Sequence, residues 1–388
     1  MSKSDLTARL YGPASTIGAE AWNACANPEG SDDPHPFTRY EFFAACEDSG
    51  SATSRNGWRP CHLAVERGGK IVGLLPLYLK NHSQGEYVFD HGWADAFARA
   101  GGSYYPKLQA SVPFTPVTGK RFLVSDGANE TEIRKALLGA AATAAEELNA
   151  SSVHITFLTE DEWKDAGAFG YLQRTDQQFH WENRGYGSFD EFLGELSSSK
   201  RKNLRKERAS VREAGVEFEW LTGAGITEAH WDQFFAFYMD TGSRKWGRPY
   251  LTRKFFSLLG QTMAEQIVLI FARRGGHYIA GALNIFGGGV IFGRNWGSLE
   301  YVPFLHFETC YYQAIDFAIA RGLKRVEAGA QGEHKLLRGY MPVPTYSAHH
   351  IVHAGLSRAV GEYLVREREA VAEQIESLAE YGPFRKSS

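Results

Sequence analysis

The same order of elements occurs twice along this chain, and this repeat restricts the fold more than any other feature. Residues 61–79 and 266–286 each contain two apolar runs that flank a Gly-Gly pair. This pattern is typical of a β-hairpin, because glycine adopts the positive φ that tight turns need. Further along, each hairpin is followed by a helix with an apolar stripe, at 131–149 and at 304–321, and then by a short apolar strand. The repeat predicts a duplicated α/β unit.

Two tandem lobes account for this repeat, and 388 residues suffice for two or three domains of ordinary size. We expect residues 1–180 to form the first lobe and residues 181–388 the second. The predicted fold class is α/β (α+β), with a mixed sheet flanked by helices in each lobe. Ser188 with Glu191 predicts a capping box that opens a helix between the two units. A last helix over 356–380 has an apolar face, which we expect to dock on the second lobe.

The composition indicates a globular protein without a strong charge bias. Lysine and arginine number 42 against 45 aspartates and glutamates, so a net charge of −3 provides no positive field for nucleic acid. No window approaches the run of about 18 apolar residues that a membrane helix needs, and no signal peptide is visible. The four cysteines form no CxxC pair, which favours free thiols. We expect a cytoplasmic protein that binds neither metal nor nucleic acid.

A strongly basic helix is predicted at residues 198–214. Residues 200–212 hold seven cations and one anion, and the arginines recur at i, i+4, i+7 and i+11, so they share one face. Three interpretations stay open: a solvated helix face, an anion site for the phosphates of a ligand, and a contact with anionic lipid at the inner membrane surface. The candidate donor-binding residues on this helix are Lys200, Arg201 and Arg205.

A second cationic segment, residues 244–250, is predicted to be a loop because it contains glycine and proline. Cations next to large aromatic rings suit the rim of a ligand cleft. An aromatic plug beneath the loop is the alternative interpretation. The candidate binding residues here are Lys245, Trp246 and Tyr250.

The densest group of reactive side chains lies between residues 326 and 340. Glu327 stands in a short apolar strand, where a buried carboxylate would need a partner. Glu333, His334 and Lys335 then place an acid, an imidazole and a cation near the carboxyl end of that strand, where ligands usually bind in open α/β sheets. We take these four residues as catalytic candidates. Two further catalytic candidates, His306 and Glu308, precede this group, and two binding candidates, Arg338 and Tyr340, follow it.

Several strings in these segments carry a family resemblance that extends over most of the chain. The most specific are Pro-Phe-Leu-His-Phe-Glu at 303–308 and Glu-Ala-Gly-Ala-Gln-Gly-Glu-His-Lys at 327–335. The chain resembles the FemAB-like proteins of the GNAT superfamily of N-acyltransferases. The resemblance implies two tandem GNAT-like lobes, with acyl transfer to an amine carried out by the second lobe. The other strings are at 93–95, 104–109, 113–116, 199–202, 245–247 and 294–297.

Two departures from the family pattern bear on the acyl donor. The GNAT pyrophosphate signature, Gln/Arg-x-x-Gly-x-Gly/Ala, is not visible before the helix over 304–321, where Leu-Glu-Tyr-Val-Pro stands at 299–303. Members that use aminoacyl-tRNA carry a long helical arm, and residues 188–214 are too short for one. We therefore expect a thioester donor, acyl-CoA, as a co-substrate, and no permanently bound cofactor.

The function predicted is N-acyl transfer from this thioester to a primary amine, either a long-chain sphingoid-like base or a cell-envelope amine. An alkyl ammonium must lose a proton in order to attack, so Glu327, Glu333 or His334 would act as the base. Lys335 or a backbone N–H would stabilise the oxyanion. Two alternatives stay open: a Fem-type aminoacyl or peptidoglycan-related transferase, and a GNAT-like module that binds a ligand without turning it over.

Overall fold

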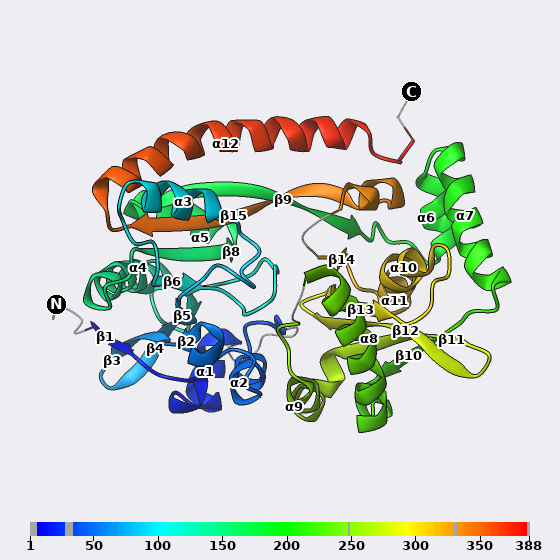
Figure 1. Ribbon diagram of the computed structural model, residues 1–388, viewed down its shortest axis with the longest axis horizontal. Coiled ribbons are helices and arrows are strands. Elements are labelled where there is room, and N and C mark those ends of the chain that lie inside the picture. Colours follow the sequence, from blue (N-terminus) through cyan, green and yellow to red (C-terminus); the bar gives the residue numbers. More distant parts are fainter. Residues whose placement is uncertain (1–5, 28–33, 247–248, 330–331, 386–388) are drawn as a thin grey trace. The chain divides into compact units, whose positions relative to one another are not determined.

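The computed structural model is a mixed α/β protein in which helices flank the sheets, as the sequence predicts (Figure 1). It describes residues 6–27, 34–246, 249–329 and 332–385, without the side chains at 243–246 and 333. No helix in these ranges is both long and apolar enough to cross a membrane.

The chain folds into two compact units. Unit 1 comprises Met1–Asp176 and Pro344–Ala372, and unit 2 comprises Gln177–Val343 and Glu373–Ser388. This grouping differs from a single cut of the chain, because a late segment folds with the first unit. The two lobes predicted from the repeat are duplicated units of sequence, which need not coincide with the compact units of the fold. The predicted lobe boundary between residues 180 and 181 therefore stays a prediction.

Two sheets form the framework of unit 1. Its strands are β1 (Leu6–Leu10), β2 (Trp58–Pro60), β3 (Leu63–Arg67), β4 (Lys70–Leu75), β5 (Leu77–Lys80), β6 (Lys107–Ala110), β7 (Leu123–Val124), β8 (Ser152–Leu158) and the greater part of β15 (Met341–Ile351). One sheet has the order β15-β8-β6-β5-β2, with β6 and β8 parallel, and the other has the order β1-β3-β4-β7. The predicted hairpin is confirmed: β3 and β4 pair across Gly68 and Gly69, whose φ values are 59° and 76°.

Helices cover the apolar face of the larger sheet. The helices of unit 1 are α1 (Ala19–Ala26), α2 (Tyr40–Asp48), α3 (His91–Arg99), α4 (Glu130–Glu147), α5 (Glu160–Phe169) and the first part of α12 (Ala354–Glu380). Ile133 and Leu137 of α4 pack in one core cluster with Leu108, Val153 and Ile155 of β6 and β8.

The long helix α12 packs differently from the prediction. Leu356, Val360 and Leu364 lie in a core cluster with Trp93 and Tyr104, all within unit 1. The expectation that this apolar face docks on the second lobe is therefore wrong for the first part of α12, whereas Leu378 near its end packs against the core of unit 2. Periodicity gives the apolar face of a helix but not the surface that covers it.

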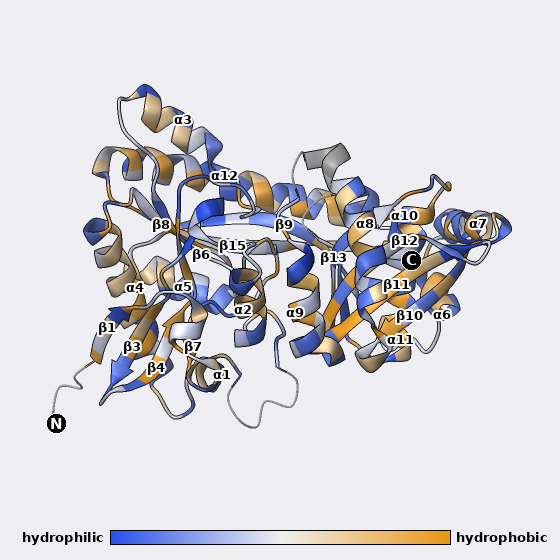
Figure 2. Cartoon of the chain, turned by 60° about the horizontal axis from the view of Figure 1, so that its bottom comes forward, coloured by the Kyte–Doolittle hydropathy of each residue, from blue (hydrophilic) through white to orange (hydrophobic). Residues whose placement is uncertain are grey.

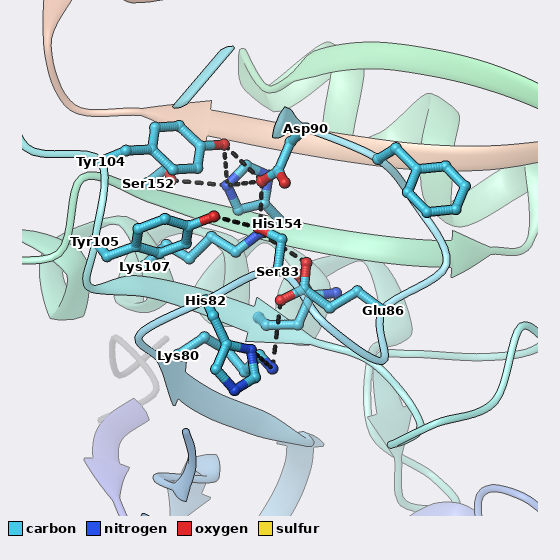
Figure 3. A network of polar contacts seen from close by, with 12 residues as sticks. Lys80, His82, Ser83, Glu86, Asp90, Tyr104, Tyr105, Lys107, Ser152 and His154 are labelled. Carbon is cyan, nitrogen blue, oxygen red and sulfur yellow. Dashed lines mark hydrogen bonds and ion pairs between the residues drawn. The ribbon is translucent and has the colours of Figure 1, made fainter. Parts of the chain in front are cut away.

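The other face of the larger sheet of unit 1 is polar although it is buried. Lys107, Gln109 and His154 alternate along β6 and β8 with the apolar core residues, and each is at most 2% exposed. Lys107 Nζ donates to Glu86 at 2.7 Å and to Asp90 at 2.5 Å (Figure 3). Burial lowers the pKa of Lys107, but the two carboxylates outweigh burial and leave the pKa above its ordinary value. The charges of this layer are therefore largely neutralised within it.

Two histidines meet in this polar layer. His154 Nδ1 lies 2.7 Å from His349 Nδ1, and the two residues are cross-strand partners in β8 and β15. One nitrogen must donate and the other accept, so the contact holds a single proton. Burial lowers the pKa of His154 to about 3, and it takes the pKa of His349 well below the ordinary value, with Lys107 and Arg174 adding to both shifts.

We expect acid to destabilise the protein through this pair. The rings stay neutral in the fold, whereas the unfolded chain binds protons below its histidine pKa of about 6.5. Stability is therefore complete above that pH and is lost as the pH falls toward 3, by up to about 1.4 kcal/mol per pH unit for each ring. Urea unfolding between pH 7 and pH 5 measures the slope. His349→Gln should reduce it, and the control His277→Gln, at an exposed turn, should not. Equal slopes in all three proteins would contradict the assignment.

One six-stranded arrangement forms the framework of unit 2. Its strands are β9 (Leu172–Glu182, from Gln177), β10 (Glu217–Thr222), β11 (Ile267–Arg274), β12 (His277–Gly287), β13 (Val290–Ser298) and β14 (Arg325–Glu327). The order is β10-β11-β12-β13-β14-β9, and only β13 with β14 is parallel among these neighbours. Figure 2 shows β11 apolar along most of its length, as a strand buried on both faces requires. The second predicted hairpin, β11–β12, is confirmed.

The predicted loop over 244–250 is wrong for residues 244–246, because a helix continues through Trp246. The helices of unit 2 include the predicted basic helix and one, Arg253–Met263, that the sequence analysis did not predict. They are α6 (Phe189–Glu195), α7 (Ser198–Glu213), α8 (Glu228–Trp246), α9 (Arg253–Met263), α10 (Leu305–Phe307) and α11 (Gln313–Ala320), with a π-helical turn η5 (Glu308–Tyr312) and a 3-10 helix η6 (Glu333–Arg338). The predicted single helix over 304–321 is thus interrupted by η5, a kind of distortion that is frequent at functional sites. The capping box is only half formed: Ser188 accepts from the Glu191 N–H, but the Glu191 carboxylate accepts from the N–H of Gly187.

Candidate functional site

The last residue of β14 is Glu327, whose side chain is 3% exposed. Its parallel pairing with β13 ends here, and its partner on β9 is His180. Arg325 lies 3.0 Å from Oε1 and His180 lies 3.8 Å from Oε2, but neither carboxylate oxygen has an aligned hydrogen-bond donor among the described residues. Burial raises the pKa of Glu327 to about 7, against the opposing effects of Arg325 and Arg294. The carboxylate is therefore buried without full compensation.

Lys335 is the second buried ionisable group of this region, with 2% exposure. Its Nζ donates to the carbonyl of Gly329 at 2.8 Å. Burial lowers the pKa of Lys335 to about 7, which the charge of Cys310 opposes and that of Arg294 assists. Burial also lowers the pKa of His180 to about 3, with Arg325 and Lys335 contributing. His180 thus lies near both groups, because it is 3.8 Å from Glu327 Oε2 and its pKa is lowered by Lys335. We call Glu327, His180 and Lys335 the Glu327 cluster.

The Glu327 cluster is suited to proton transfer near neutral pH. An isolated glutamate and an isolated lysine titrate several pH units apart, whereas burial brings both groups here to about 7. A general base works best when its pKa lies near the working pH. Perturbed carboxyl and amino groups within one region are also a typical sign of a functional site. The arrangement can therefore accept a proton at Glu327 while Lys335 offers a positive charge.

A set of aromatic rings, those of His306, Tyr311 and His334, is linked to this cluster through the sequence, since His334 directly precedes Lys335. His334 is exposed, and its Nε2 lies 2.9 Å from the hydroxyl of Tyr311. The ring of His306 lies 5.3 Å from that of Tyr311 and 6.3 Å from that of His334. The rings of His306 and His334 thus lie close to each other, while their catalytic role stays a prediction.

Glu308 is held in an ion-pair network instead of standing beside Glu327 in the cluster. Arg208 of α7 donates to Glu308 at 2.9 Å and to Asp316 at 2.6 Å, and Gln313 donates to Glu308 at 2.9 Å. Burial raises the pKa of Glu308, although Arg208 opposes the shift. These contacts give Glu308 a structural role that the sequence did not indicate.

The basic helix α7 and the segment around residue 333 contact each other within unit 2. Arg338 donates to Glu207 at 2.8 Å, and its guanidinium lies 3.4 Å from the ring centroid of Phe307. Tyr340 is fully buried and donates to the carbonyl of Tyr311 at 3.3 Å. Their predicted roles in binding are untested, as are those of the remaining candidates. Lys200, Arg201 and Tyr250 are partly exposed, Arg205 is exposed and paired with Asp190, and the side chains of Glu333, Lys245 and Trp246 lie outside the described part.

The sequence analysis did not identify His180. It lies on β9 near the expected boundary between the lobes, where a functional residue was not sought. The sequence around it shows only an alternation, in which the polar residues Gln178 and His180 flank the apolar residue Phe179. In the structure both polar residues are buried beside the core residues Phe179 and Trp181. Polar positions that alternate with large apolar ones normally face solvent, so burial on both faces was not predictable from the pattern.

Comparison with known proteins identifies the family. The family described as FemAB-like, peptidoglycan biosynthesis/recognition, matches residues 13–386. This chain belongs to the FemAB-like family. The family covers both units, so the fold and the Glu327 cluster lie within the matched region. A search of curated proteins finds no match.

Solved structures with a similar fold include three that cover nearly the whole chain. FemX matches with a TM-score of 0.54 and 13% identity, over 89% of this chain and 98% of that one. L-PGS from Bacillus licheniformis matches with a TM-score of 0.51 and 11% identity, over 86% and 98%. A tandem GNAT protein from the clavulanic acid biosynthesis pathway matches with a TM-score of 0.50 and 11% identity, over 90% and 99%. The chain therefore has the predicted tandem GNAT-like fold. At this level of identity the likeness concerns the fold alone.

Residues that could hold a metal were also sought. Across the described ranges, no group of three or more His, Cys, Asp or Glu side chains is placed to bind a metal ion.

The Arg208–Glu308 contact gives a testable prediction about stability. Arg208→Met should lower the free energy of unfolding by about 2 kcal/mol or more, because it leaves a buried carboxylate without its cation. Adding Glu308→Gln should restore part of that loss, since the charge is then removed. Denaturant titration measures both. The matched control on the same helix is Arg205→Met, whose exposed pair with Asp190 should contribute less than about 1 kcal/mol. Equal losses for the two arginines would refute the assignment.

Proposed function

We propose that this protein transfers an activated acyl or aminoacyl group to a primary amine of a peptidoglycan-related acceptor, with Glu327 as the general base. The family description and the GNAT-like fold support a Fem-type transferase. The observation that carries the proposal is the carboxylate of Glu327, which is buried, lacks aligned donors and has a pKa of about 7. Such a group can take a proton from an ammonium ion near neutral pH.

In the proposed step Glu327 first takes one proton from the acceptor ammonium and releases it to solvent. The neutral amine nitrogen then attacks the carbonyl carbon of the donor, and its second proton passes to Glu327. The ammonium of Lys335 stabilises the oxyanion of the tetrahedral intermediate. Collapse of the intermediate breaks the bond between the carbonyl carbon and the leaving oxygen or sulfur. The leaving group then takes the proton from Glu327, so the carboxylate is restored and an amide is formed.

The acceptor in this proposal differs from the one that the sequence analysis put first. The family match favours the Fem-type alternative, with a peptidoglycan-related amine, over a long-chain sphingoid-like base. A thioester such as acyl-CoA remains the second candidate donor. It is favoured by the shortness of α6 and α7, with 7 and 16 residues, because the resemblance associates an aminoacyl-tRNA donor with a long helical arm.

Replacement of either reactive group should abolish most of the transfer. Glu327→Gln and Lys335→Met are each expected to lower the rate by about 10²-fold or more, because the base or the oxyanion partner is lost. The assay offers acyl-CoA or aminoacyl-tRNA with peptides that carry a free side-chain amine, and it measures released thiol or uncharged tRNA. The control Glu217→Gln removes an exposed acid from β10 of the same sheet and should stay within about threefold of the parent.

Two results would decide against parts of this proposal. A folded Glu327→Gln protein that transfers at the parent rate would exclude Glu327 as the base. A parent protein that releases neither thiol nor tRNA with any amine, yet binds the peptides, would indicate the non-catalytic binding module.

The pH dependence of transfer should be bell-shaped with a maximum near 7. The rate rises as Glu327 loses its proton and falls as Lys335 loses its positive charge, and both groups have a pKa of about 7. Lys335→Arg keeps the charge at every accessible pH, so the alkaline limb should disappear. Rates between pH 5 and pH 9 with a soluble peptide acceptor test this expectation. An unchanged alkaline limb in a folded Lys335→Arg protein would remove Lys335 from the mechanism.

A further inference from the structure

Three large apolar side chains are exposed close together in unit 2, in the segment between β13 and α10. Leu299 is 55% exposed, Tyr301 is 90% exposed and Phe304 is 38% exposed. Isolated exposed apolar residues are common on protein surfaces, but a local group of them marks an interaction site more often than chance. We call these three residues the apolar segment.

The apolar segment is fixed to the end of the basic helix. Val302, within the segment, is buried in a core cluster with Val211 and Val216, at the end of α7 and just after it. Leu305, the first residue of α10, belongs to the same cluster. The buried members hold the segment in place, so the exposure of its neighbours is not explained by a loose backbone. Figures 1 and 2 both show α10 near α7.

The basic helix presents cations to solvent along one face. Lys202, Arg205, Lys206 and Arg212 are all exposed. At 100° per residue they fall within an arc of about 120°, opposite the buried Leu204 and Val211. The last of these cations adjoins Val211, which contacts the apolar segment's cluster. Apolar side chains and a cationic face thus occur on adjoining elements.

We propose that this surface binds an anionic lipid bilayer, with the apolar segment inserted at the interface and the exposed cations of α7 against the headgroups. Tyrosine and phenylalanine suit the boundary between acyl chains and headgroups, and lysine and arginine attract anionic lipid. The exposed leucine adds apolar area. This favours a bilayer over RNA as the anionic partner, because the RNA backbone has no apolar surface to cover it. The proposal concerns attachment and holds whether or not the proposed transfer reaction is correct.

Vesicle flotation with the full chain tests the proposal. The protein should float with vesicles of phosphatidylcholine and phosphatidylglycerol, and much less with phosphatidylcholine alone. Leu299→Ser/Tyr301→Ser and Lys202→Gln/Lys206→Gln should each lower the bound fraction at least about tenfold. Added salt should weaken binding of the parent, and it should weaken that of the cation variant less.

Matched controls separate the surface from general effects. Lys70→Gln/Lys135→Gln removes two exposed lysines from unit 1, and Tyr381→Ser removes an exposed ring elsewhere, so both proteins should float like the parent. Circular dichroism and unfolding midpoints check that every variant folds. Because neither test pair belongs to the Glu327 cluster, both variants should keep their transfer rate on soluble peptides.

Three outcomes would overturn the proposal. The first is that the parent protein floats no better with anionic vesicles than with neutral ones. The second is that the apolar segment variant binds as well as the parent, which would leave only a surface charge effect. Alternatively, the parent binds RNA and not vesicles, with binding lost in the cation variant alone, which would identify the basic face as a nucleic-acid contact. Loss of transfer with flotation intact would affect the proposed function only.

Discussion

The parallel pairing of β13 with β14 ends at Phe292 and Glu327, and this end of pairing determines the chemistry of unit 2. β13 continues to Ser298, while the chain leaves β14 and reaches Gly329 with a φ of 81°. Glu327 is therefore the last residue held by the sheet on both sides, and its carboxylate stays buried. Lys335 donates to the carbonyl of Gly329, two residues after Glu327 in the chain.

The two units treat buried charge in different ways. In unit 1, Lys107 donates to Glu86 and Asp90, and these carboxylates leave its pKa above the ordinary value. Burial nevertheless lowers the pKa of the neighbouring Lys80 to about 7 and raises that of Glu86. In unit 2, Glu327 has cations nearby but no aligned donor, and its pKa rises accordingly. A compensated buried network fixes a structure, whereas an uncompensated group is free to exchange a proton with a substrate. The proposed reaction is placed in unit 2 because both oxygens of Glu327 lack an aligned donor within the described ranges, whereas Glu86 and Asp90 each accept from Lys107.

Local signals in the sequence were sufficient for part of this description. Gly-Gly pairs gave both hairpins, and a charged residue within Val-Glu-Ala indicated Glu327. Contacts over long sequence separations were not accessible in the same way. Arg208 contacts Glu308 across 100 residues, so a cation assigned to a solvent-facing or ligand-binding face is used within the fold. The buried polar sheet face of unit 1 was not predicted, because polar residues that alternate with apolar ones in a strand usually face solvent.

The apolar segment gives one physical account of the unusual sequence before α10. In the GNAT superfamily this position carries a glycine-rich pyrophosphate signature, and here Leu-Glu-Tyr-Val-Pro stands at 299–303 instead. The N–H groups of Leu299 and Glu300 are already donated to Ile279 and Ser298, and Leu299 and Tyr301 expose their side chains to the surroundings. The same segment leads directly into α10 and η5, which carry His306 and Tyr311. A bilayer bound there would hold an amphiphilic acceptor next to the elements that precede the Glu327 cluster in the chain, which joins the attachment and the chemistry in one stretch of sequence.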